Sequence, residues 1–300
     1  MLMPKNKVRE TAFAWLVYLA GLGLCLFVLF ISPRRQVVQL GELIELANQE
    51  LFLPEILEKP SSQEQLFQCE ELLVAGLGPH HLPFGAELLQ DVYQTLATCR
   101  PDVNLIVLLS PDHFQTYPQH LITADLRFKT SLGVVQTDMD FLAKLAGGPW
   151  QSRLVFDPKP FYEEHGIQAH LPFIQKYYPQ AQLVPILVGE RVSKQTAIEL
   201  GRFLADSLPA QGLLVLSLDL SHYQDVATAR SEDDKTIIIL ERVDSSDLSQ
   251  LKADSPLGVL ALFSYLDALG VDSGQVLGRA NSADFGADSR STTGYAGLVY

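Results

Sequence analysis

The chain has 300 residues, enough for one large domain or two ordinary ones, and 47% of them are hydrophobic against 19% charged. This balance predicts a sizeable buried core and excludes a chain that is disordered throughout. The formal net charge of −13 argues against a general nucleic-acid-binding surface, which requires a basic patch, so we expect no nucleic-acid partner.

An apolar run without charged residues occupies residues 11–32, and about 20 such residues span a bilayer core as a helix. No small-x-small cleavage site follows the run. We therefore predict a single-pass transmembrane anchor at 11–32 after an N-terminal tail at 1–10, with a cleaved signal peptide and a buried core helix as alternatives. The flanking basic residues slightly favour a cytoplasmic N-terminus, which would place the rest of the membrane-anchored protein outside the cytoplasm.

Residues 33–68 are predicted to form a juxtamembrane helical segment and linker, because apolar residues recur there at helical spacing until a Lys-Pro-Ser-Ser sequence at 59–62 interrupts them. The α/β domain is predicted to occupy 69–300. Cys69 precedes its first predicted strand, and Cys99 ends the helix that returns antiparallel to that strand. The two cysteines could therefore form a disulfide, which would agree with an extracytoplasmic domain, or could be unrelated.

Beyond Cys69, short apolar runs alternate with stretches of helical spacing. The expected strands lie at 72–77, 104–109, 182–188, 213–218, 275–279 and 293–300, and the expected helices at 87–98, 164–178, 193–208, 227–243 and 256–269. This alternation predicts an α/β fold, in which a layered, mixed or largely parallel sheet is flanked by helices. In such sheets, ligands bind at the carboxyl ends of the strands.

Three of the expected strands are each followed by a histidine, namely His80, His113 and His222. Because the strand ends share one edge of the sheet, we expect these side chains to lie close together. A fourth histidine, His165, opens an expected helix. Imidazoles bind transition metals and move protons near neutral pH, so the pattern predicts a metal or acid–base site. The alternative is a chance gathering of loop histidines.

Carboxylates lie beside these histidines in the sequence. Asp112, Glu164 and Asp219 could be metal ligands or could orient the imidazole rings through hydrogen bonds. Two other histidines are predicted to lie outside the site. His120 precedes a short expected strand, and His170 falls on a different face of the expected helix from the histidine that opens it.

Seven sequence strings occur in the order expected of Memo-like proteins, which in bacteria are called AmmeMemoRadiSam system protein B. They are GPHHLPFG, LLSPDHF, EEHGIQAHLPF, LVPILVG, LSLDLSHY, DSPLGVLALF and TTGYAGLVY. The resemblance runs from Glu71 to Tyr300. It implies a fold like that of class III extradiol dioxygenase catalytic subunits, which hold non-haem iron. It also implies copper or iron binding, redox activity, and radical-SAM and AMMECR1-like proteins as partners.

The same resemblance assigns roles to individual residues. His80 and His113 match the first two metal-site histidines of the family, so we assign them as metal ligands. Asp219 and His222 match the family's Ser-Asp-x-x-His motif, and His165 matches the histidine of its Glu-His-Ser motif. We assign these three as catalytic residues.

The chain departs from the family pattern at three places in this site. Residues 79–83 read Pro-His-His-Leu-Pro where the family commonly has Pro-His-Ala-Gly-Tyr. Gly166 stands where the family has serine, and Lys252 stands where many members have a cysteine ligand. We expect Asp254 to supply an oxygen ligand instead; its alternative role is to cap the helix that begins at Pro256. Two histidines and a carboxylate suit ferrous iron or zinc better than cuprous copper. Iron is therefore the expected divalent metal, with copper and zinc as alternatives.

The expected function is that of a membrane-anchored, metal-dependent oxidoreductase similar to the dioxygenases. The metal would bind an unknown small molecule together with dioxygen, or would activate a water. His165 and His222 would transfer protons, and Asp219 would set the tautomer or the charge of the imidazole rings. Two alternatives stay open: a non-catalytic module that binds a peptide or small anion in the same pocket, and a metal-dependent hydrolase.

Overall fold

The computed structural model describes residues 41–46, 57, 69 and 72–300. The tail and the membrane span expected at 1–10 and 11–32 lie outside these residues. Within the described part, no helix combines the length and the apolar character needed to cross a membrane.

Among the described residues, nine strands form a mixed sheet whose centre is parallel. Four neighbouring strands run in the same direction: β2 (Ala75–Gly78), β9 (Gly212–Ser217), β3 (Leu105–Pro111) and β8 (Gln182–Val188). Next to β2, strand β12 (Thr292–Val299) runs antiparallel. These central strands are mostly apolar along their length because both of their faces are covered.

At the two margins of this sheet, the strands are short or run antiparallel to their neighbours. On one side, β4 (Leu121–Thr123) pairs antiparallel with β8 and parallel with β7 (Leu154–Phe156). On the other side, β10 (His222–Gln224) and β11 (Gln275–Asn281) both pair antiparallel with β12. The expected mixed sheet is thus confirmed.

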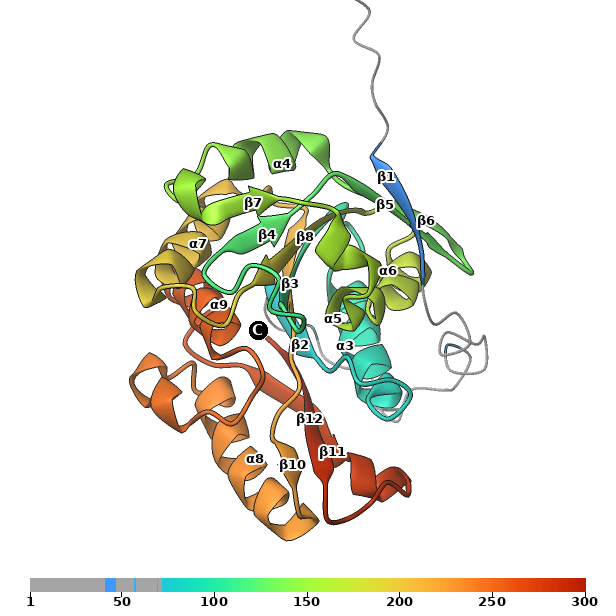
Figure 1. The fold of residues 1–300 in the computed structure, drawn as a ribbon, viewed down its shortest axis with the longest axis vertical. Coiled ribbons are helices and arrows are strands. Elements are labelled where there is room, and N and C mark those ends of the chain that lie inside the picture. Colours follow the sequence, from blue (N-terminus) through green and yellow to red (C-terminus); the bar gives the residue numbers. More distant parts are fainter. Residues whose placement is uncertain (1–40, 47–56, 58–68, 70–71) are drawn as a thin grey trace, which may run out of the picture. The chain divides into compact units, whose positions relative to one another are not determined.

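Helices cover both faces of the sheet (Figure 1). The alternating side chains of β3 show the two layers. Val107 and Leu109 belong to the hydrophobic cluster that includes residues of α7 and α9. Ile106 and Leu108 belong to the cluster that includes residues of α3 and α6. The helices are α3 (Ala86–Cys99), α4 (Met139–Ala146), α5 (His165–Gln168), α6 (Leu171–Tyr177), α7 (Lys194–Ser207), α8 (Val226–Glu241) and α9 (Pro256–Leu269), with short 3₁₀ helices η2 (Gln151–Arg153), η3 (Lys159–Tyr162), η4 (Ser245–Gln250) and η5 (Ser282–Phe285).

The helix expected at 164–178 is two helices, α5 and α6. Pro172 lies in the first turn of α6, where a missing backbone N–H costs nothing. The break places His165 at the start of α5 and His170 at the N-cap of α6. The two histidines therefore belong to different helices.

The helix expected within 33–68 is wrong at Glu42–Glu45, which form strand β1. β1 pairs parallel with β5 (Leu126–Thr130), and β5 pairs antiparallel with β6 (Gly133–Gln136), so these strands make a second sheet. Ile44 is 2% exposed while its neighbours face outward, which is a strand pattern. Pairing with β5 outweighs the helical spacing, and the described fold extends upstream of Cys69.

Cys69 and Cys99 form a disulfide with an S–S distance of 1.99 Å and a Cα–Cα distance of 5.4 Å. The sequence left this pairing open, and of its two alternatives the structure contains the disulfide. The bond joins the C-terminal end of α3 to the segment before β2.

Candidate metal centre

Five of the expected site residues meet at one edge of the sheet. His80 follows β2, Asp219 follows β9 and His113 follows β3, which are three adjacent parallel strands. His165 opens α5, and Asp254 lies two residues before α9. The carboxyl ends of the strands thus bring these side chains together, as the sequence predicts. We call these five residues the histidine cluster.

The side chain of Asp254 lies at the centre of the histidine cluster. Its Oδ2 atom is 3.1 Å from Nε2 of His80 and 3.7 Å from Nε2 of His113. Oδ2 also accepts a hydrogen bond from the backbone N–H of Asp219 at 3.3 Å. The N-cap residue of α9 is Ser255. Asp254 is therefore aimed at the histidines instead of capping the helix.

Ligand atoms in the cluster lie close enough to share one ion. In the part of the chain that the structure describes, His80, His113 and His165 form one such group, and His80, Asp219 and Asp254 form another, with all ligand atoms of a group within 4.8 Å. The Oδ1 atom of Asp254 is buried and makes no hydrogen bond to the described residues. Imidazole nitrogens and carboxylate oxygens in one group suit iron or zinc.

A serine determines which nitrogen of His80 faces the cluster. Ser217 Oγ donates its single proton to the carbonyl oxygen of Gly166 at 2.7 Å. It can therefore only accept from Nδ1 of His80, which lies 2.8 Å away. When the ring is neutral, its Nε2 then carries the lone pair and points at the carboxylates. Ser217 acts as the outer partner that metal-binding histidines usually have.

Glu164 does the same for His113. This carboxylate is fully buried and accepts from Nδ1 of His113 at 2.5 Å and from the backbone N–H of His113 at 3.1 Å. It also accepts from the backbone N–H of Gly166 at 3.0 Å, which caps α5. Glu164 therefore orients His113 and leaves its Nε2 facing Asp254.

The charges of the cluster are strongly coupled. Burial opposes the charged form of His113, but Asp254 and Glu164 outweigh it and raise its pKa to about 10. Burial likewise opposes the charge of His80, whose pKa is nevertheless raised by Asp219 and Asp254. Burial alone would raise the pKa of Asp254, yet His80 and His113 hold it well below its usual range. The metal-free cluster thus holds protons where a cation would bind.

His165 differs from the other two histidines. Its side chain is 50% exposed, and its ring lies 4.0 Å from that of His113 and 5.3 Å from that of His80. Burial and the neighbouring positive charges of His113 and His80 lower its pKa to about 4. His165 is therefore neutral near pH 7 and can accept a proton at the mouth of the cluster.

His222 lies beside the cluster and belongs to neither group of shared ligand atoms among the described residues. Its Nδ1 donates to the carbonyl oxygen of Leu220 at 2.8 Å, within the segment that enters β10. Nearby, burial lowers the pKa of His81, and Nδ1 of His81 lies 2.8 Å from the hydroxyl of Tyr295. His222, His81 and Tyr295 form a polar margin next to the cluster.

Sequence reasoning missed the roles of Ser217 and His81, and it placed His170 correctly outside the histidine cluster. Ser217 is the last residue of β9, and a polar residue that ends a buried strand was the available signal. His170 is fully buried, with Nδ1 at 3.0 Å from the hydroxyl of Tyr93. Burial, with a contribution from His80, lowers its pKa to about 3. His170 is a neutral histidine of the core.

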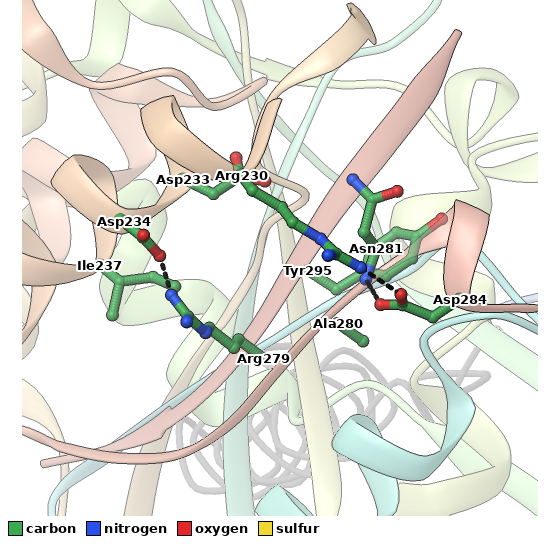
Figure 2. A pocket seen from close by; sticks show the side chains of 9 residues that line it. All are labelled: Arg230, Asp233, Asp234, Ile237, Arg279, Ala280, Asn281, Asp284 and Tyr295. Atoms are coloured by element: carbon green, nitrogen blue, oxygen red, sulfur yellow. Dashed lines mark hydrogen bonds and ion pairs between the residues drawn. The ribbon is translucent and has the colours of Figure 1, made fainter. Parts of the chain in front are cut away.

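A separate pocket of about 190 Å³ lies between α8, β11 and η5, and Figure 2 shows its side chains. Two ion pairs cross it, one between Arg230 and Asp284 and one between Arg279 and Asp234. No member of the histidine cluster lines this pocket. Its wall includes Tyr295, whose hydroxyl lies 2.8 Å from Nδ1 of His81.

Comparison with known proteins identifies relatives over most of the chain. The family model described as "Memo-like protein" matches residues 53–299. A MEMO1 family protein of Methanosarcina acetivorans is 28% identical over 226 residues, covering 72% of this chain and 81% of the relative. One from Aquifex aeolicus is 27% identical over 205 residues, covering 65% and 74%.

A solved structure shares the fold. The crystal structure of an uncharacterised protein from Escherichia coli K12 superposes with a TM-score of 0.50 at 15% sequence identity. The match covers 75% of this chain and 99% of that protein.

Proposed function

Because the chain belongs to the Memo-like protein family, we propose that it is a metal-dependent oxidoreductase whose divalent metal is held by His80, His113 and Asp254. One observation carries the proposal. Nε2 of each histidine faces the same Asp254 oxygen, at 3.1 Å and 3.7 Å, while each Nδ1 is engaged by an outer partner. Rings oriented in this way are ready to bind a cation.

The donor set supports ferrous iron. Two imidazoles and a carboxylate with room for further ligands are typical of non-haem iron sites, whereas cuprous copper prefers thiolates and thioethers. Lys252 stands where the family's cysteine would be expected, and its side chain is exposed. The buried Oδ1 of Asp254 and the adjacent carboxylate of Asp219 offer further oxygen ligands. Zinc and copper are the alternatives that elemental analysis distinguishes.

When bound, a ferrous ion supplies Lewis acidity and one-electron chemistry. The protein's own residues supply position and proton transfer. His165, neutral near pH 7 and half exposed beside His113, would accept a proton from a substrate hydroxyl. Asp219 accepts from the backbone N–H of His80 at 3.0 Å and so helps to place that ring. His222 would contact the part of a substrate that extends over the polar margin.

Two other functions are consistent with particular features. A neutral His165 next to a metal could take a proton from water, which favours a metal-dependent hydrolase as the second candidate. A non-catalytic module for a peptide or small anion would use the exposed face of His165 and the exposed ring of Phe114 at 6.5 Å from it. Metal-dependent turnover distinguishes both enzymes from the module.

The cellular setting is part of the proposal. The apolar run at 11–32 supports a single-pass membrane anchor. The disulfide between Cys69 and Cys99 supports an extracytoplasmic domain, because disulfides persist in oxidising compartments. Radical-SAM and AMMECR1-like partners are proposed on the family's naming alone.

Elemental analysis of the purified full-length chain in detergent tests the metal site. We expect about one transition metal ion per chain, lost in the double variant His80→Ala and His113→Ala. His120→Ala is the matched control, since His120 belongs to neither group of shared ligand atoms, and it should keep the metal. Two results would refute the assignment. One is a double variant that keeps the metal, and the other is a wild-type protein that holds far less than one metal ion per chain after iron loading. Oxygen consumption abolished by chelation would then favour the oxidoreductase over the hydrolase.

A further inference from the structure

A buried tyrosine and a buried histidine form a hydrogen-bonded pair that the proposed function does not use. The hydroxyl of Tyr93, in α3, lies 3.0 Å from Nδ1 of His170, the N-cap residue of α6. Both residues are 0% exposed, and the ring of Tyr93 stacks on that of Phe173 in the apolar core. We call Tyr93 and His170 the buried pair.

The hydrogen bonds available to the buried pair determine which atom holds the shared proton. Nε2 of His170 is buried and has no partner among the described residues. If Nδ1 carried the ring proton, the hydroxyl proton of Tyr93 and the lone pair of Nε2 would both lack a partner. If Tyr93 donates instead, only the N–H of Nε2 lacks one. The phenol is therefore the donor, and the lone pair of Nδ1 accepts its proton.

A hydrogen-bonded base distinguishes Tyr93 from other buried tyrosines. In the described part of the chain, the buried hydroxyl of Tyr178 has no partner. The hydroxyls of Tyr265 and Tyr300 donate to backbone carbonyl oxygens. Loss of one electron makes a phenol strongly acidic, and a neutral imidazole takes up the released proton, whereas a carbonyl oxygen does not. The contact with His170 therefore makes Tyr93 easier to oxidise than these three tyrosines.

We propose that the buried pair is a one-electron redox centre, in which Tyr93 is oxidised to a neutral tyrosyl radical while its hydroxyl proton moves to Nδ1 of His170. The electron passes to a one-electron oxidant, namely a transition-metal ion in its higher oxidation state. The O–H bond of the phenol breaks, and an N–H bond forms on the imidazole, so the positive charge left by the electron resides on His170. Before this step His170 is neutral, because burial, with a contribution from His80, lowers its pKa to about 3. Return of the electron and the proton restores the pair.

The buried pair lies against the end of β2, the strand that leads to His80. A Cβ atom at Gly78, the last residue of β2, would lie 3.9 Å from Cε1 of His170, and His80 follows two residues later. The charge of His80 also acts on His170. The pair would thus supply one electron to the metal of the histidine cluster. That use rests on the proposed function, whereas the oxidation of Tyr93 itself does not require the metal.

A second contact between a tyrosine and a histidine is the alternative place for a radical. The hydroxyl of Tyr295 lies 2.8 Å from Nδ1 of His81. His81 is partly exposed, whereas His170 is fully buried. A radical at Tyr93 is therefore better shielded from solvent, and the experiment has to separate the two tyrosines.

Electron paramagnetic resonance tests the proposal on the metal-free, full-length chain in detergent, frozen after oxidation with hexachloroiridate(IV). The exposed Tyr162 and Tyr223 are replaced by phenylalanine in every sample, because exposed phenols also react. We expect a long-lived radical whose signal narrows when the chain carries ring-deuterated tyrosine. Tyr93→Phe should remove most of this signal. Tyr178→Phe is the matched control, at a buried tyrosine without a base among the described residues, and should keep it.

His170→Asn separates a redox role from a structural one. Asparagine keeps an oxygen that accepts from the hydroxyl of Tyr93, but an amide does not take up the proton. We expect this variant to have the circular dichroism spectrum of the parent chain and to lose most of the radical. If the variants of the buried pair do not fold, isotope-labelled histidine in the Tyr295→Phe chain replaces them, and a coupling between the radical and a histidine nitrogen is expected.

Several results would overturn the proposal. They are a parent chain without a long-lived radical, a signal that persists in Tyr93→Phe or in His170→Asn, and a signal that disappears in Tyr295→Phe. Each is measured without the metal, so it is independent of the elemental analysis. A chain that forms the radical and binds no transition metal would contradict the proposed function alone.

Discussion

Ser217 and Glu164 control the histidine cluster without being needed as ligands. Each accepts a hydrogen bond from Nδ1 of one imidazole, and each also bonds to the backbone of Gly166. Ser217 donates to the carbonyl oxygen of Gly166, and Glu164 accepts from the N–H of Gly166. A single peptide segment at the start of α5 thus holds both outer partners. The orientation of His80 and His113 depends on hydrogen bonds between strand ends and this segment.

Ser217→Ala is expected to lower metal affinity by about 10- to 100-fold, because His80 Nδ1 loses its acceptor and the ring loses its preferred tautomer. Competition with a chromophoric chelator measures the effect, and circular dichroism checks the fold. Ser110→Ala serves as the control, since the hydroxyl of Ser110 bonds to the carbonyl oxygen of Pro111 and not to a histidine. Equal affinity in the Ser217→Ala variant would contradict the assigned role.

Gly166→Ala is expected to destabilise the protein by about 1–3 kcal/mol, because an added Cβ would overlap with Oγ of Ser110. The double variant with Ser110→Ala removes that oxygen and should recover most of the loss. Denaturant unfolding of the three variants measures the difference. A double variant as unstable as Gly166→Ala would show that Ser110 is not the obstacle. In this chain, the Ser110 hydroxyl thus occupies the space that a side chain at position 166 would need.

At the scale of elements, the strands that carry the cluster could be predicted and the segment before them could not. β3 and β9 are mostly apolar runs, so their ends, and with them the positions of His113 and Asp219, could be predicted from the sequence. β1 is four residues with one buried side chain, and its pairing with β5 depends on contacts far along the chain. The outer role of Ser217 was equally hidden, because its partner Gly166 lies 51 residues away.

Removing the disulfide tests how far it stabilises the link between α3 and β2. The bond closes a 30-residue separation, for which chain entropy gives about 3–4 kcal/mol. Cys69→Ser with Cys99→Ser should therefore lower the Tm by roughly 10 °C in calorimetry. Cys25→Ser is the control, since Cys25 takes no part in this bond. A wild-type protein whose Tm does not respond to reductant would contradict the prediction.

In the metal-free protein, we expect the free energy of unfolding to depend on pH through the titrating groups of the histidine cluster. His113 has a folded pKa of about 10, above its unfolded value, so its contribution to stability is complete below about pH 6.5 and is lost as pH rises through about 10. The pKa values of Glu164 and Asp254 are lowered, so their contribution is present above about pH 4.5 and lost as pH falls. The lowered pKa values of His165 and His170 also act on the acid side, because these rings resist protonation in the folded state and so destabilise it as pH falls below about 6.5. Metal-free protein should thus be most stable near about pH 6.5.

Thermal unfolding of metal-free protein from pH 4 to pH 10 measures this dependence. The decline above about pH 6.5 should be smaller in His113→Ala, which lacks the titrating group. His120→Ala should retain the wild-type profile. A wild-type Tm that rises steadily from pH 6.5 to 10 would contradict the predicted sign.

The position of β12 has a consequence for synthesis of the protein. Among the strands that the structure describes, β2 pairs antiparallel with β12 alone, through Leu77 and Leu298, which are separated by 221 residues (298 − 77). At about 5–20 residues per second, a ribosome needs roughly 10–45 s to make that stretch. His80 emerges at the start of this interval, before the strands that position it exist. We therefore expect the sheet around the histidine cluster to be completed only when translation is nearly finished, because the β2 edge that pairs with β12 stays unpaired until then.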